Sequence, residues 1–174
     1  MNIASDDKIA AILPRYTDNG DGTVIIDARG QEVFYPVGYK PIIRQLAGRH
    51  CKDICLLRDW AKVKVGRRLW LPLGFSWELV LTPIKVRDVR VKGDGTLGYV
   101  NLTHIKRVKE IENIASVELN NGMIIPVLWQ LETLRHHLKD AILLHFNIVH
   151  VIDKTIWKRL YKNVEMLQLY KKSE

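Results

Sequence analysis

The feature of this chain that most constrains its fold is an Asn-Gly pair between two alternating runs. Residues 116–119 and 123–126 alternate along the chain, and Asn121-Gly122 lies between them. Asparagine and glycine tolerate the positive φ angles of the tight turns that join paired strands. The pattern therefore predicts an antiparallel β-hairpin in the second half of the chain.

Short apolar runs separated by turn residues also occupy the beginning of the chain. Residues 9–13, 23–26 and 32–35 are such runs, with glycine-containing turns between them. Short runs bounded by glycine, asparagine and aspartate are typical of strands. We expect a β meander here.

The middle of the chain alternates apolar and basic residues. We expect strands over residues 62–71 and 77–81, and a third over residues 84–92, where the two-residue period is cleanest. The alternation slips near Asp88 and Val89, which is typical of a β-bulge. Such a bulge would let four side chains point outward: Lys85, Arg87, Arg90 and Lys92.

Other segments have a helical period. Residues 128–145 and 153–171 each carry the apolar stripe of an amphipathic helix. The predicted class is α+β, with an antiparallel β-rich core, one or two helices inserted near residues 40–61, and two C-terminal amphipathic helices. We expect one domain over residues 1–152, and a helix over residues 153–174 that packs on it or mediates oligomerisation.

The net charge of +8 is concentrated in one part of the sequence. Residues 58–109 hold twelve basic and four acidic residues, while the remaining 15 basic and 15 acidic residues cancel. A surface formed by this stretch would attract nucleic acid or another anionic partner. The alternative is a solvated strand face that binds nothing.

Several classes of function leave no signature in the sequence. It contains no phosphate-binding loop, no HExxH zinc pattern and no Gly-x-Ser-x-Gly elbow, so we expect no enzyme, metal site or cofactor. The amino terminus is unlike a signal peptide, and charged residues or histidines interrupt every apolar run. We therefore expect a cytoplasmic protein without membrane contact.

Cysteine and tryptophan are both expected in structural roles. Cys51 and Cys55 stand four residues apart in a predicted helix, where we expect two buried thiols. We also expect Trp60, Trp70 and Trp77 in the core rather than on a stacking surface for bases.

Short motifs in a characteristic order point to a family. They are Ile12-Leu13-Pro14, Val33-Phe34-Tyr35, Lys40-Pro41-Ile42-Ile43 with the later Cys51, Leu71-Pro72-Leu73, Val80-Leu81-Thr82-Pro83, Gly98-Tyr99-Val100-Asn101-Leu102-Thr103-His104-Ile105 and Val117-Glu118-Leu119-Asn120-Asn121-Gly122. In order and approximate spacing they resemble the competence transcription factor (ComK) family over residues 8–145. The resemblance implies a sequence-preferring, DNA-binding transcription regulator that favours A·T-rich minor-groove sites.

A second, partial resemblance covers residues 90–140. The segment 99–105 and the hairpin 117–127 are similar to LytTR-type DNA-binding domains. That resemblance implies loops of a β-sheet that enter the major groove. The alternative outside DNA binding is a phage or cell-structural interaction protein with a basic β face.

The candidate DNA-binding residues follow from the charge and the resemblance. Lysine and arginine would contact phosphates, and arginine suits the negative potential of a narrow minor groove. The phosphate candidates are Lys62, Lys64, Arg67, Arg68, Lys106 and Lys109; the minor-groove candidates are Arg87 and Arg90; the base-contact candidates are Asn101, Thr103 and His104; and Lys85, Lys92 and Arg107 complete the basic set. The expected partners are double-stranded DNA, further copies of the chain, and an adaptor-protease system that the family suggests would engage residues 165–171.

Overall fold

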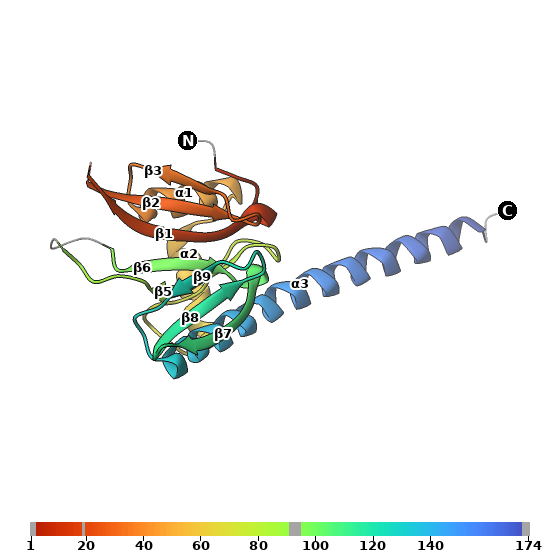
Figure 1. Cartoon of the computed structure of the whole chain (residues 1–174). Helices are drawn as coiled ribbons and strands as arrows, with labels where there is room; N and C mark the ends of the chain where they lie inside the picture. The colour runs from red at the N-terminus through yellow and green to blue at the C-terminus, as the bar shows by residue number, and fades with distance from the viewer. Residues whose placement is uncertain (1–2, 19, 91–94, 172–174) are drawn as a thin grey trace.

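The computed structural model describes residues 3–18, 20–90 and 95–171 (Figure 1). Its largest element is a six-stranded antiparallel sheet with the strand order β3-β2-β1-β6-β5-β4. The strands are β1 (Ile9–Thr17), β2 (Gly20–Asp27), β3 (Glu32–Tyr35), β4 (Leu73–Gly74), β5 (Val80–Lys85) and β6 (Leu97–Asn101). The first three confirm the predicted meander.

A second sheet holds β7 (Ile105–Ile111), β8 (Ile114–Leu119) and β9 (Ile124–Pro126). The β8–β9 hairpin is the predicted one, and Gly122 has the positive φ of 86° that its turn requires. Strand β7 was not predicted. Its apolar residues Ile105, Val108 and Ile111 are spaced by three, so no two-residue period marked the strand. The register shift between Ile105 and Arg107 brings Ile105 and Val108 to one face, whereas Ile111 lies on the other.

Two helices, α1 (Tyr39–Arg49) and α2 (Ile54–Val65), follow the meander, as the pattern near residues 40–61 predicted. Helix α2 begins at the cap Asp53, whose carboxylate accepts a hydrogen bond of 2.9 Å from the Leu56 amide. It ends at Gly66, which has a left-handed φ of 69°. The strand predicted from residue 62 is therefore wrong, because residues 62–65 form the last turn of α2.

The apolar residues of the large sheet divide between its two faces. One face, with Ile12 and Ile25, packs against Leu46 of α1 and Leu57 of α2. The other face forms a second core with the small sheet and the beginning of α3 (Leu131–Lys171). The fold is thus α+β, with the large sheet between a two-helix layer and a layer of the small sheet and α3.

The C-terminal region is one helix rather than the two predicted. Helix α3 is continuous from Leu131 to Lys171, so the expected boundary between residues 152 and 153 falls inside it. Its first part packs on β5, α2 and the small sheet, and the rest projects away from the body (Figure 1). Within the described part of the chain, no helix is both long and apolar enough to cross a membrane.

Several other local predictions are wrong. Strand β5 ends at Lys85, and residues 86–90 form no strand. Trp70 and Trp77 are exposed rather than in the core, and Trp60 is half-buried. Cys51 and Cys55 are both exposed free thiols, because Cys51 lies in the α1–α2 connection at a φ of 52° and Cys55 lies in the first turn of α2.

The side chain of Asn101, at the end of β6, connects three segments. Its Oδ1 accepts a hydrogen bond of 3.2 Å from the Val80 amide, and its Nδ2 donates to the Ile9 carbonyl at 3.0 Å and the Glu78 carbonyl at 2.8 Å. The residue is fully buried. Asn101 therefore satisfies backbone groups where β1, β5 and β6 meet.

We expect Asn101→Ala to lower the free energy of unfolding by about 2–3 kcal/mol, because it leaves buried backbone groups without partners. Urea unfolding measures the loss. Thr103→Ala is the control, since the exposed Thr103 donates a single bond of 3.2 Å to the same Glu78 carbonyl, and its loss should stay below about 1 kcal/mol. Equal losses for the two variants would contradict the structural role of Asn101.

Candidate nucleic-acid interface

The predicted DNA-binding residues come from several elements. They occupy the end of α2, the α2–β4 connection, the end of β5, the β5–β6 connection, the end of β6 and the turn after it, and β7. Lys92 lies outside the described residues. Ion pairs and burial distinguish the cations that are free to contact an anionic ligand from those that are paired with carboxylates within the protein.

Three of the predicted cations surround one buried carboxylate. Lys106, Arg107 and Lys109 of β7 lie 3.0, 2.8 and 2.8 Å from the carboxylate of Glu118, whose side chain is only 8% exposed. Hydrogen bonds from Lys109, Arg107 and Lys106 hold the pKa of Glu118 far below its usual range. One of the three positive charges is therefore neutralised inside the protein.

The β5–β6 connection (residues 86–96) holds two arginines with different environments. Arg87 is 11% exposed, lies 2.6 Å from the Asp21 carboxylate and donates to the Gly95 carbonyl at 2.8 Å. The prediction that Arg87 points outward is wrong, because Asp21 lies near the start of β2 and Gly95 lies at the end of the connection itself. Arg90 is exposed, and its guanidinium lies 4.6 Å from the ring centroid of Tyr16.

The three base-contact candidates all have hydrogen-bond partners within the protein. Asn101 is fully buried and has no surface to offer a base. Thr103 is exposed and bonds to the Glu78 carbonyl, while the half-buried His104 has Nε2 2.8 Å from the Asp7 carbonyl oxygen. These groups hold the end of β6 against the N-terminal segment.

The remaining candidates lie at the end of α2 and beside β5. Lys62 pairs with Asp59 at 2.7 Å, Arg67 with Asp140 at 3.0 Å, and Lys85 with Asp88 at 2.7 Å. Lys64 and Arg68 are exposed, and no described carboxylate pairs with either. Of the set from α2 and its following connection, these two remain available to an anion.

The tertiary structure places the charge excess in the two-helix layer, defined as residues 39–68. This segment has nine basic and two acidic residues, a net charge of +7. The rest of the chain has 18 basic and 17 acidic residues, so it contributes only +1. The sequence window of residues 58–109 began inside α2 and therefore missed Lys40 and Arg44, although the signal was present in the sequence.

A groove of about 580 Å³ runs between α1 and α2. Lys40, Arg44 and Arg58 line it, with Asp53 as its only acidic residue. Lys52 also lines it, but its Nζ donates to the Gly74 and Phe75 carbonyls at 3.2 and 2.7 Å, and burial lowers its pKa. The groove can therefore accept an anionic chain.

The β5–β6 connection approaches this groove at Tyr39. A Cβ added to Gly95 would come within 2.6 Å of the Tyr39 ring, so the absent side chain permits the close contact. Tyr39 lines the groove, and its ring centroid lies 5.7 Å from that of Tyr99. Burial raises the pKa of Tyr99 to about 12, so its hydroxyl remains protonated. The connection that carries Arg90 is thus anchored at one end of the groove.

Comparison of the chain with protein-family models, with curated proteins and with solved structures finds no match.

His137 is a buried histidine that packs against an aromatic side chain. No cluster of three potential metal ligands occurs among the described residues. His137 is 1% exposed and stacks on Trp129 with ring centroids 4.4 Å apart. Burial, together with the charges of Arg67 and His136, lowers its pKa to about 4.

The depressed pKa of His137 predicts a loss of stability in acid. The unfolded chain binds this proton near pH 6.5 and the folded chain near pH 4, so stability falls as the pH drops through that window. We expect a contribution of about 1–2 kcal/mol after solvent screening, measured by urea unfolding between pH 7 and pH 4. His137→Phe should flatten this dependence, and an unchanged slope would contradict the assignment.

Proposed function

We propose that this protein is a DNA-binding transcription regulator of the competence factor (ComK) type. The observation that carries the proposal is the net charge of +7 on the two-helix layer. Such a concentration of cations supports contacts with a phosphate backbone, which supply most of the affinity of proteins for DNA. The motif order of residues 8–145 supports the same function independently of the charge.

The proposed contacts divide between the helices and the β5–β6 connection. Lys40, Arg44 and Lys64 are exposed, and none pairs with a described carboxylate, so they are the proposed phosphate contacts. Arg90 is the proposed minor-groove residue, because it is exposed and Tyr16 supports its guanidinium. A narrow A·T-rich minor groove attracts arginine through its negative potential.

We expect the triple variant Lys40→Gln, Arg44→Gln, Lys64→Gln to weaken binding to an A·T-rich duplex by at least about tenfold. It should also reduce the slope of log affinity against log salt by about two to three, since each phosphate contact releases counterions. Fluorescence anisotropy over a salt series measures both quantities. The control variant Lys8→Gln, Arg29→Gln, Lys139→Gln removes the same charge from other exposed sites and should bind nearly as the wild type does.

Equal losses for the two triple variants would mean that only net charge matters, which would contradict an interface on the helices. No retardation of any duplex by the wild type would contradict DNA binding altogether. That result would favour the interaction-protein alternative.

We expect Arg90→Gln to reduce the preference for A·T-rich over G·C-rich duplexes while affinity for the G·C-rich duplex changes little. The physical reason is that a minor-groove arginine distinguishes groove width rather than phosphate charge. Competition binding with the two duplexes measures the ratio. A uniform loss of affinity on both duplexes would assign Arg90 to phosphate contact. If methyl groups placed on bases in the major groove changed the affinity of the wild-type protein, the LytTR-like mode would be favoured.

The other expected partners remain proposals. Oligomerisation would give the paired half-site contacts common among transcription regulators. Residues 165–171, the proposed segment for an adaptor-protease system, have side chains outside the described part of the structure. A cytoplasmic location follows from the proposed function.

A further inference from the structure

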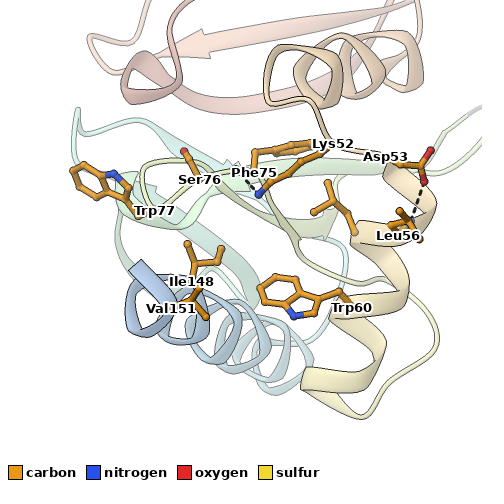
Figure 2. Close-up of a pocket in the computed structure, with 10 residues that line it drawn as sticks. Lys52, Asp53, Leu56, Trp60, Phe75, Ser76, Trp77, Ile148 and Val151 are labelled. Atoms are coloured by element: carbon orange, nitrogen blue, oxygen red, sulfur yellow. Dashed lines mark hydrogen bonds between the residues drawn. The ribbon is translucent and has the colours of Figure 1, made fainter. Parts of the chain in front are cut away.

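Helix α2 borders a second groove, different in character from the basic one. This groove has a volume of about 700 Å³ and lies between α2, α3 and the β4–β5 connection. Figure 2 shows Trp60 of α2 on one side and Ile148 and Val151 of α3 beside it, with Phe75 and Lys52 along the edge of the same opening. We call it the apolar groove.

A glycine in β4 allows α2 and α3 to pack closely against the strand at the groove. Gly74 of β4 lies beneath Ile148, and a Cβ added there would come within 2.6 Å of the Ile148 side chain and 3.6 Å of the Trp60 ring. The polar residues at the groove are already satisfied, since Lys52 bonds to two carbonyls and Asp53 caps α2. The surface left for a ligand is therefore predominantly apolar.

The apolar groove exposes side chains that proteins normally bury. Leu56 is 69%, Trp77 54% and Val151 61% exposed. They come from three separate elements and surround one concavity. An apolar patch gathered around a groove marks a site of protein interaction.

Two lysines of α3 lie beyond one end of the apolar groove. Lys154 and Lys158 follow Val151 by one and two turns on the same side of α3, and both are exposed. Among the described side chains, neither has a carboxylate partner. An occupant that extends along α3 from the apolar groove would therefore meet two positive charges.

We propose that the apolar groove binds an amphipathic helix of a partner protein, with large apolar residues along one face and carboxylates at one end. Grooves between helices accept such segments through side chains at the spacing i, i+3 or i+4, and i+7. The carboxylates of the partner would pair with Lys154 and Lys158. This inference does not depend on the proposed binding of DNA, because it is drawn from the residues of the apolar groove and from Lys154 and Lys158, none of which is a proposed DNA contact.

Charge argues against a second copy of the chain as the occupant. The projecting part of α3, residues 152–171, is the amphipathic segment that another copy could offer, and it holds five basic and two acidic residues. Docking it beside Lys154 and Lys158 would bring like charges together, which opposes association. An acidic segment meets no such repulsion.

The test is a selection from a displayed library of random 16-residue peptides on the immobilised full-length protein at about 150 mM salt, where long-range charge effects are screened. Selected peptides should combine apolar residues at helical spacing with Asp and Glu. Their affinities are then measured by fluorescence anisotropy on purified variants. Leu56→Glu with Val151→Glu should weaken binding at least tenfold. Val33→Glu with Ile124→Glu, an equally acidic pair of changes at exposed residues outside the groove, should not.

A second variant tests the charge. Lys154→Glu with Lys158→Glu should weaken the acidic peptides and strengthen versions of the same peptides in which Lys replaces Glu. The proposal is overturned if no peptides are selected, if the selected peptides bind the Leu56→Glu, Val151→Glu variant unchanged, or if they carry no excess of acidic residues. It is also overturned if sedimentation shows that the wild type is a dimer and that the Leu56→Glu, Val151→Glu variant is a monomer, because the occupant of the groove would then be a second copy of the chain.

Discussion

The structure depends on a short junction between two halves of the large sheet. Strands β1 and β6 join the halves through only two residue pairs, Ala11 with Val100 and Ile12 with Tyr99. Asn101 reinforces this junction from β6 by bonding to the backbone of β1 and of the segment that begins β5. Because the amide is fully buried, each of these bonds is made away from competing water, and together they fix how the meander meets the rest of the fold.

The fold uses many of its cations for its own stability. Glu118 pairs with three basic residues of β7, and Arg87 joins the β5–β6 connection to β2 through Asp21. A count of basic residues therefore overstates the charge available to a ligand. In the two-helix layer, Arg49, Lys62 and Arg67 pair with Asp6, Asp59 and Asp140, and among the described residues the other six of its nine cations have no carboxylate partner.

Helix α2 gives the protein two surfaces of opposite chemistry. On the side of α1, Arg58 contributes to a basic groove, and on the side of α3, Leu56 and Trp60 contribute to an apolar one. The two sides follow from helical geometry, which sends residues two apart to different faces. The basic groove is the basis of the proposed contact with DNA, and the apolar groove is the basis of the proposed contact with a protein partner.

The sequence alone determined the local elements whose patterns are self-contained: the meander, the hairpin at Asn121-Gly122, and the helices near residues 40–61. It failed where tertiary contacts override a local period, as in β7, at the end of α2, and in residues 86–90. Composition likewise determined the net charge of +8 but not its location on the surface. Only the tertiary structure decided that Glu118 pairs with three cations of β7, that Asn101 is buried and that α2 borders two grooves, because partners distant in sequence decide which side chains remain exposed.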